Sequence, residues 1–201
     1  MGNEVTVPIE VSARHVQLSS DDAVKLFGKD YRFSKLRSLS ERKRYACNET
    51  VTLTTPKRSI EDVRIIGPTV DQTRVELSRT DAVYLGINPP IRMAKSIDLQ
   101  GTTGLRLVGP QGSLFLKQGV IIPKRHIHVG PFDALKYHMR DESYVRVRIE
   151  GARALTFDQV LVLVEEEMSF VLHLDVDEAN AAGVYGSPSH GTVLAEKKNS
   201  L

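Results

Sequence analysis

The sequence predicts a β-rich fold, either barrel-like or α+β, in preference to a parallel sheet of the dinucleotide-binding type. Its 201 residues show about twelve short strand-like stretches and about four short helical ones. Glycine and proline separate most of the strand-like stretches, as they do in hairpins and barrels. The sequence contains neither the GxGxxG fingerprint nor a Walker phosphate loop.

Apolar alternation and capping signals predict the elements in the first half of the chain. We expect strands at residues 4–11, 45–53, 60–66 and 72–77. Acidic and hydroxyl residues precede short apolar stretches that predict helices at 23–27 and 82–85, which end at Gly28 and Gly86. The polar and basic stretch 29–44 is predicted to be an ordered loop.

The second half of the chain continues in the same way. Short strands are expected at residues 105–108, 113–116, 120–122, 144–149, 155–157, 160–164 and 170–174. Short helices are expected at 134–138 and at 177–182, and the second of these ends at Gly183. We expect the polar tail from Ser187 onward to be partly mobile.

Two pairs of segments resemble each other and suggest an internal repeat. The hairpin-like stretch 53–68 resembles 107–123, and Arg14-His15-Val16 before a helix resembles Arg125-His126-Ile127 before a helix. Hairpins with glycine and proline turns commonly look alike, so the first pair alone does not establish a repeat. The paired Arg-His stretches favour a duplicated barrel module with a site shared between the copies.

Composition excludes several classes of protein. A net charge of +2 gives no electrostatic case for nucleic-acid binding. The single cysteine, Cys47, excludes an intrachain disulfide framework and fits a reducing compartment. No apolar run reaches the length of about 18 residues that a membrane-spanning helix needs. Residues Met1 to Pro8 contain no basic segment followed by an apolar one, so we expect no secretory signal. We therefore expect a soluble cytoplasmic protein without a membrane partner, and a homo-oligomer is one alternative that stays open.

Four histidines at predicted strand ends are candidates for a metal site: His15, His126, His128 and His173. His126 and His128 lie two apart, so their side chains share one strand face about 7 Å apart. One histidine on an apolar strand is more often a packed core residue, but metal ligands are usually gathered from strand ends that are distant in sequence. Glu76 could add a carboxylate, and this donor set suits one or two zinc ions.

The other histidines, the cysteine and the basic stretch give weaker evidence for a functional site. His138 and His190 are expected at the surface, and Cys47 is expected to pack in its strand. The stretch 35–44 carries five lysine and arginine residues. It could be a solvated face, or it could receive a phosphorylated ligand such as a nucleotide.

Four motifs together resemble the phosphate propanoyltransferases, also called PduL-type phosphotransacylases. They are Ser12-x-Arg14-His15-Val16-x-Leu18, the stretch VELSRTDA at 75–82, Lys124-Arg125-His126-Ile127-His128, and LHLDVDEANAAG at 172–183. The similarity extends from about Val5 to about Leu194, which is nearly the whole chain.

The resemblance implies a mostly β fold of two β-barrels with short capping helices, related as an internal duplication. Residues 4–13 and 124–194 would form one barrel, residues 14–123 the other, and 195–201 a polar tail. The implied reaction exchanges a short acyl group, acetyl or propanoyl, between coenzyme A and inorganic phosphate to give an acyl phosphate. Acyl-coenzyme A and phosphate would then be the partners, and zinc the cofactor.

The resemblance also carries roles onto particular residues. Family metal positions, which normally surround two zinc ions, correspond to His15, Gln17, Glu76, His126, His128 and His173. Coenzyme A contacts correspond to Ser12, Arg37, Arg64 and Asn180, with Arg37 where a lysine is usual.

Two positions depart from the family pattern. Gln17 stands where the first motif usually has its second histidine, and Val70 stands where the family usually has an arginine near the phosphate. Glutamine is a poor zinc ligand, and valine cannot bind phosphate. If the segment is one regular strand, Arg74 shares a face with Val70 and Glu76, so we assign Arg74 the catalytic role of binding phosphate.

The departures at Gln17 and Val70 support one alternative, a diverged non-catalytic paralogue that binds coenzyme A or a partner protein. A zinc-dependent thioester hydrolase is a further alternative. Members of the family that enter microcompartments carry an amphipathic N-terminal extension. The sequence shows no such extension before its first strand, so we expect a free cytoplasmic form.

Overall fold

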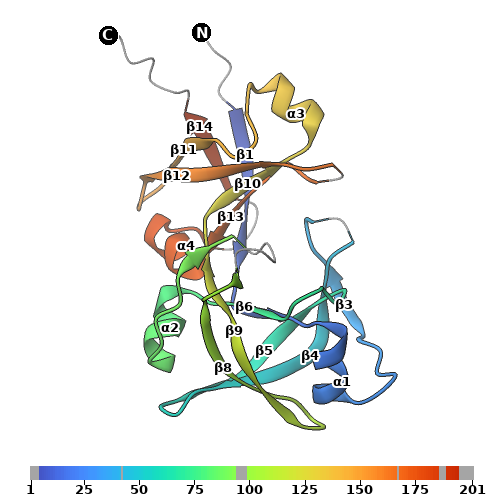
Figure 1. Ribbon diagram of the computed structural model, residues 1–201. Helices are drawn as coiled ribbons and strands as arrows, with labels where there is room; N and C mark the ends of the chain where they lie inside the picture. Colours follow the sequence, from blue (N-terminus) through green and yellow to red (C-terminus); the bar gives the residue numbers. More distant parts are fainter. Residues whose placement is uncertain (1–4, 42, 94–98, 167, 186–188, 195–201) are drawn as a thin grey trace. The chain divides into compact units, whose positions relative to one another are not determined.

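The structure, a computed structural model, describes residues 5–41, 43–93, 99–166, 168–185 and 189–194 (Figure 1). Within these ranges the chain forms strands β1 to β14 and helices α1 to α4. The described residues fall into two compact units. The first contains the N-terminal strand to Ser12, Ser40 with Glu41, and the chain from Lys124 onward, and the second contains Ala13–Leu39 and Lys43–Pro123.

The first unit is a closed barrel whose strands follow the order β1-β13-β10-β12-β11-β14. Its strands are β1 (Val5–Ser12), β10 (His126–Val129), β11 (Tyr144–Ile149), β12 (Leu155–Val164), β13 (Val171–Asp175) and β14 (Ser189–Leu194). Helix α3 (Pro131–Lys136) follows β10, and helix α4 (Val176–Ala182) follows β13. The N-terminal strand therefore completes a barrel that is otherwise built from the C-terminal part of the chain.

The second unit also closes, because β8 pairs with both β4 and β9. The ring runs β4-β5-β2-β6-β9-β8, from β2 (His15–Gln17), β4 (Tyr45–Thr54), β5 (Ser59–Gly67), β6 (Arg74–Glu76), β8 (Thr103–Val108) and β9 (Ser113–Pro123). Strands β3 (Lys35–Ser38) and β7 (Ile91–Arg92) pair with β4 and β9 outside this ring. Helices α1 (Ser20–Phe27) and α2 (Arg79–Leu85) follow β2 and β6.

The two barrels share one pairing plan. Strand β2 is parallel to β5 and antiparallel to β6, just as β10 is parallel to β12 and antiparallel to β13. Strand β6 is parallel to β9, and β13 is parallel to β1. The prediction of a mostly β fold with two duplicated barrels and short helices is therefore confirmed.

The pairing plan also corrects one half of the predicted repeat. The hairpin β4-β5 corresponds to β11-β12, because each hairpin leads into the strand that lies parallel to β2 or β10. It does not correspond to β8-β9, with which the sequence resemblance matched it. Glycine and proline turns made two different hairpins look alike, whereas the Arg14-His15 and Arg125-His126 stretches do occupy equivalent places ahead of α1 and α3.

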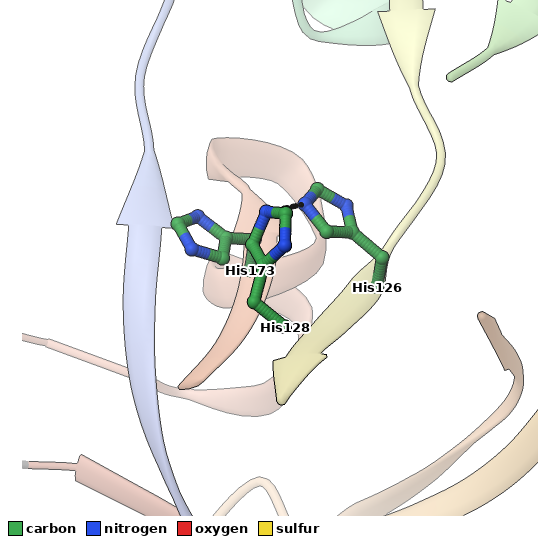
Figure 2. Close-up of side chains that lie close together, drawn as sticks. All are labelled: His126, His128 and His173. Atoms are coloured by element: carbon green, nitrogen blue, oxygen red, sulfur yellow. Dashed lines mark hydrogen bonds between the residues drawn. The ribbon is translucent and has the colours of Figure 1, made fainter. Parts of the chain in front are cut away.

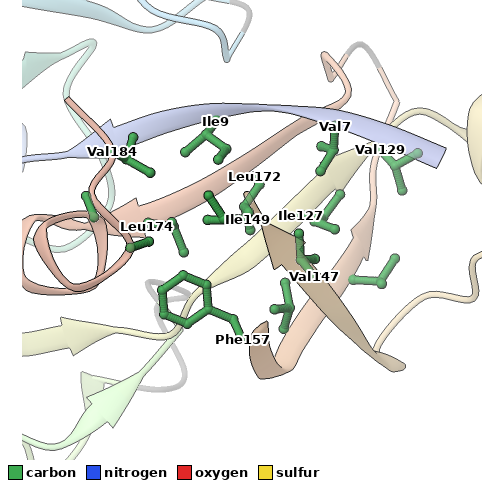
Figure 3. Close-up of a cluster of buried hydrophobic side chains, with 14 of the residues drawn as sticks. Val7, Ile9, Ile127, Val129, Val147, Ile149, Phe157, Leu172, Leu174 and Val184 are labelled. Atoms are coloured by element: carbon green, nitrogen blue, oxygen red, sulfur yellow. The ribbon is translucent and has the colours of Figure 1, made fainter. Parts of the chain in front are cut away.

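Each barrel has its own apolar core. In the first unit the strand β1 alternates, so that Val7 and Ile9 point inward between exposed or half-buried neighbours. Ile127 of β10 and Leu172 of β13 meet them there (Figure 3). The core of the second unit is built in the same way from the inward residues of its six barrel strands and from helix α1.

Helices α2 and α4 begin and end with the same devices. Each opens on a capping box, Ser78 with Asp81 in α2 and Asp175 with Glu178 in α4. Each closes on a glycine in the left-handed region, where φ is 69° at Gly86 and 68° at Gly183. The two helices begin earlier than predicted, because the polar first turn of each is helical once its cap is formed.

Several predicted boundaries were wrong for reasons that lie outside the local sequence. The stretch 29–44 contains β3, because its backbone pairs with β4. The two strands predicted at 113–116 and 120–122 are one strand, β9, which bends at Gly119 with a φ of 118°. A Cβ at Gly119 would lie 2.6 Å from the carbonyl oxygen of Thr73, so the bend requires glycine. The stretches predicted at 155–157 and 160–164 likewise form one strand, β12.

The C-terminal tail is also more regular than predicted. Residues Ser189–Leu194 form β14, which pairs with β1 and β11 and closes the first barrel. The rest of the stretch predicted to be a mobile tail, 187–188 and 195–201, lies outside the described residues. None of the described helices is long and apolar enough to cross a membrane.

Truncating Leu172 tests the core of the first barrel. Leu172→Ala removes a side chain that is 0% exposed, and we expect it to lower the free energy of unfolding by about 2–5 kcal/mol. Leu135→Ala is the matched control, because Leu135 of α3 is 78% exposed, and it should change stability by less than about 0.5 kcal/mol. Urea unfolding followed by circular dichroism measures both. Equal losses in the two variants would contradict this assignment of the core.

Candidate functional site

Three histidines of the first unit lie together at the junction of β10 and β13. The antiparallel register places His126 directly opposite His173, and the two-residue period of the strand places His128 on the same face. Their nearest ring nitrogens all lie within 4.8 Å of one another. Figure 2 shows the three imidazoles close together, with a dashed line between two of them. The Nε2 atoms of His126 and His128 are 3.1 Å apart.

The surroundings of this histidine triad (His126, His128 and His173) favour a bound cation. The Nδ1 atom of His126 lies 2.7 Å from the carbonyl oxygen of Lys124, which can only accept a hydrogen bond. In the neutral ring Nδ1 therefore carries the hydrogen, and Nε2 keeps its lone pair. His128 Nε2 lies 3.9 Å from a carboxylate oxygen of Glu41, and its Nδ1 lies 3.6 Å from one of Glu165. Three converging imidazoles with carboxylates nearby fit zinc, which takes three histidines and leaves a fourth position open in catalytic sites.

A second polar group lies at the corresponding place in the second unit. His15 of β2 is opposite Glu76 of β6, and Gln17 is opposite Arg74. Arg74 Nη2 donates to Gln17 Oε1 at 2.6 Å, and Gln17 Nε2 lies 3.4 Å from His15 Nε2. His15 Nε2 is 3.6 Å from Glu76 Oε2. His15 Nδ1 contacts the carbonyl oxygen of Ala13 at 3.0 Å, so this ring is oriented in the same way as that of His126.

The structure thus places the six residues predicted at metal positions in two sets of three, one in each unit. The first unit brings together His126, His128 and His173. The second brings together His15, Gln17 and Glu76, with Arg74 beside them. That the two sets form one metal site stays a prediction.

Sequence reasoning missed the function of the arginine before each histidine. Arg125 Nη1 donates to Glu178 Oε1 at 2.7 Å, and its Nε donates to the carbonyl oxygen of Asp158 at 2.8 Å. Arg14 forms the equivalent ion pair with Asp81. Each arginine therefore ties a histidine strand to the capping box of the helix that follows the partner strand. The spacing of arginine, histidine and capping box in both repeats was the signal that could have revealed this.

The Glu178 carboxyl group, which belongs to the capping box of α4, has a raised pKa. Burial raises the pKa of the Glu178 carboxyl, the negative charge of Asp175 raises it further, and Arg125 opposes both effects. Burial also raises the pKa of Asp175 itself. Arg125 thus supplies a positive charge where two carboxyl groups share one helix terminus.

The strand predicted at 72–77 is shorter than expected, and this changes the argument about Arg74. Strand β6 covers only Arg74–Glu76, and Val70 lies outside it in an isolated bridge to Ser19. The condition under which Arg74 would share a strand face with Val70, one regular strand through both, is therefore not met. Arg74 and Glu76 do share a face, and Arg74 is buried.

The four residues predicted to contact coenzyme A lie in both units. Ser12 ends β1 and Asn180 lies exposed on α4, both in the first unit. In the second unit, Arg37 is exposed on β3. Arg64 of β5 donates from Nη1 to the carbonyl oxygens of Cys47 at 3.1 Å and Asn48 at 2.7 Å. Their contacts with coenzyme A stay predictions.

Three residues that the sequence excluded from the site lie as expected. His138 is exposed just after α3, and His190 is exposed, although it belongs to β14 and not to a tail. Cys47 is fully buried in the core of the second unit.

The chain resembles known proteins over most of its length. The sequence profile described as phosphate propanoyltransferase matches residues 8–185. The phosphate propanoyltransferase of Thermotoga maritima is 47% identical over 180 residues, which cover 89% of this chain and 85% of that protein. The enzyme of the same name from Clostridioides difficile is 43% identical over 190 residues, 94% of this chain and 88% of that protein. The phosphate propanoyltransferase of Citrobacter koseri is 43% identical over 195 residues, which cover 96% of this chain and 91% of that protein. These relatives do not favour the non-catalytic or hydrolase alternatives.

The burial of Cys47 leads to a prediction about its reactivity. Burial raises the pKa of the Cys47 thiol to about 11, so almost none of it is thiolate at neutral pH. We expect Ellman's reagent at pH 8 to modify the native protein at least about a hundredfold more slowly than the protein unfolded in guanidinium. Rapid stoichiometric reaction of the folded protein would contradict this placement.

Proposed function

Since the chain belongs to the phosphate propanoyltransferase family, a family of acyltransferases, we propose that it exchanges an acetyl or propanoyl group between coenzyme A and inorganic phosphate. The products of the forward direction are an acyl phosphate and free coenzyme A. The feature of the site that supports the proposal is the histidine triad of the first barrel, in which His126 is half-buried and His128 and His173 are buried. We assign zinc to this triad.

The proposed reaction breaks the thioester C–S bond and forms a C–O bond to phosphate. Phosphate is already an anionic nucleophile, so no serine or cysteine nucleophile is required, in keeping with the buried Cys47. The negative charge that develops on the thioester carbonyl oxygen must be stabilised, and the sulfur leaves as a thiolate that takes up a proton. When bound, zinc supplies a positive charge for that oxygen or for the phosphate.

The protein's own residues hold these groups in place. The Lys124 carbonyl fixes the ring of His126, and the ion pair of Arg125 with Glu178 fixes the strand that carries it. We assign Ser12, Arg37, Arg64 and Asn180 to coenzyme A. Arg37 is well suited to a phosphate of the coenzyme, because it lies exposed on β3 in the basic stretch 35–44.

We assign the binding of inorganic phosphate to Arg74. Its guanidinium is permanently charged, and the hydrogen bond to Gln17 fixes its position. The burial of Arg74 strengthens its attraction for an anion, because water screens the charge less. The assignment does not depend on whether Arg74 and Val70 lie on the same face of one strand. It rests on the burial of Arg74 and on its hydrogen bond to Gln17.

The dependence of coenzyme A release on phosphate tests the proposed function. We expect propanoyl-coenzyme A to be cleaved only when phosphate is present, with an acyl phosphate as the product. Removal of metal by a chelator should abolish the reaction, and zinc should restore it. Release of free thiol is followed colorimetrically, and the acyl phosphate is trapped as a hydroxamate. Release without phosphate would identify a hydrolase, and no release from zinc-loaded protein would identify a non-catalytic protein.

Substitution of Arg74 tests its assignment to phosphate. Arg74→Ala removes a charge-assisted contact, and we expect the KM for phosphate to rise about 10- to 100-fold while the KM for the acyl-coenzyme A changes little. Arg74→Lys keeps the charge and should restore part of the affinity. Thermal melts confirm that both variants fold. An unchanged KM for phosphate in Arg74→Ala would remove Arg74 from the phosphate site.

A further inference from the structure

The duplicated fold allows the two polar groups to be compared position by position. The register of β2 with β6 and of β10 with β13 pairs the equivalent residues as follows: His15 with His126, Gln17 with His128, Glu76 with His173, and Arg74 with Val171. The second unit therefore has the histidine triad's geometry with three of the four positions changed. One change introduces a cation where the first unit has a buried apolar residue.

The first change places Gln17 at the position that corresponds to His128, and the only atom of its side chain that could ligate a metal is already hydrogen-bonded. A glutamine can ligate a metal only through its side-chain oxygen. In Gln17 that oxygen accepts a hydrogen bond from Arg74 Nη2 at 2.6 Å, and the two residues are 2% and 6% exposed. The amide nitrogen, which is a donor, lies 3.4 Å from His15 Nε2, the nitrogen that would otherwise ligate the metal.

The charged side chains beside the second unit's polar group disfavour a bound cation, whereas those beside the histidine triad favour one. Arg74 stays protonated at all working pH values, and its Nε lies 4.0 Å from Glu76 Oε1, so it offsets the charge of the one acidic ligand. A divalent cation placed beside Arg74 would be repelled in a site that water screens poorly. In the first unit, by contrast, Glu41 and Glu165 lie beside His128 and attract a cation.

We propose that the group formed by His15, Gln17, Glu76 and Arg74 holds no transition metal ion, and that the Arg74 guanidinium is the permanent cation at that position. The chain then carries one zinc ion, at the histidine triad, in place of the two that the family resemblance implies. The inference rests on the proposed function in one respect, namely that the metal of the triad is zinc. Gln17 is a positioning residue in this proposal, because its side-chain oxygen accepts the hydrogen bond that orients Arg74.

One residue then accounts for both departures from the family pattern. Arg74 supplies a cation to a chain that has Val70 in place of the usual arginine. Arg74 also explains Gln17, since an amide oxygen can accept a hydrogen bond from a guanidinium N–H group, whereas a metal-bound imidazole cannot.

Metal stoichiometry tests this inference directly. The full chain is purified with excess zinc, passed through a desalting column and measured by mass spectrometry of its metal content. We expect one zinc per chain in the wild type, close to none in His173→Ala, and still one in His15→Ala. Two zinc ions in the wild type, falling to one in His15→Ala, would overturn the proposal. Circular dichroism melts show that each variant is folded.

A gain of metal provides the complementary test. Gln17→His combined with Arg74→Gln removes the cation and restores an imidazole, and we expect a second zinc to bind, while Gln17→His alone should stay at one. The visible spectrum of the cobalt-substituted protein reports the new site independently of the count. A double variant that still binds one ion, with an unchanged cobalt spectrum, would contradict the exclusion of metal by Arg74.

These measurements do not depend on turnover, so they separate the two proposals. Wild-type protein with one zinc and no phosphate-dependent release of coenzyme A would refute the proposed function and support the metal inference. Protein that releases coenzyme A only with phosphate and carries two zinc ions would support the proposed function and refute the metal inference.

Discussion

The antiparallel pairing of β10 with β13 is the constraint on which the candidate site depends. It fixes His126 opposite His173, and the strand period then brings His128 to the same face. The pairing is held from both sides: Ile127 and Leu172 anchor the opposite faces of these strands in the core, and Arg125 ties β10 to the cap of α4. An imidazole cluster that would otherwise be mobile is therefore pre-organised, which is what metal binding requires.

The same construction appears twice in the chain, and the second copy has changed its chemistry without changing its frame. Arg14 and Asp81 repeat the ion pair of Arg125 and Glu178, and both helices keep their capping boxes. The side chains on the strand faces opposite the core differ: Gln17, Glu76 and Arg74 replace the equivalents of His128, His173 and Val171. The duplicated barrel thus keeps the ion pairs and capping boxes and varies the side chains of the candidate site, so that the same frame presents a histidine triad in one unit and a guanidinium in the other.

Local signals in the sequence predicted the fold class, the four helices and the equivalence of the two Arg-His stretches, because alternation, caps and glycine ends are properties of neighbouring residues. The sequence did not predict β3 or β14, whose regularity comes from pairing with strands that are distant in the chain. It also mismatched β4-β5 with β8-β9, since turn composition says nothing about which strand a hairpin joins. The contact of Arg74 with Gln17 lies beyond sequence reasoning for the same reason: it exists only through the register of β2 with β6.

The most direct test of the account is an anomalous difference map recorded at the zinc absorption edge from crystals of the zinc-loaded protein. The account predicts one strong peak within about 2.0–2.1 Å of a ring nitrogen of each of His126, His128 and His173. A map with no peak at the triad, or with a second peak at His15 and Glu76, would contradict it.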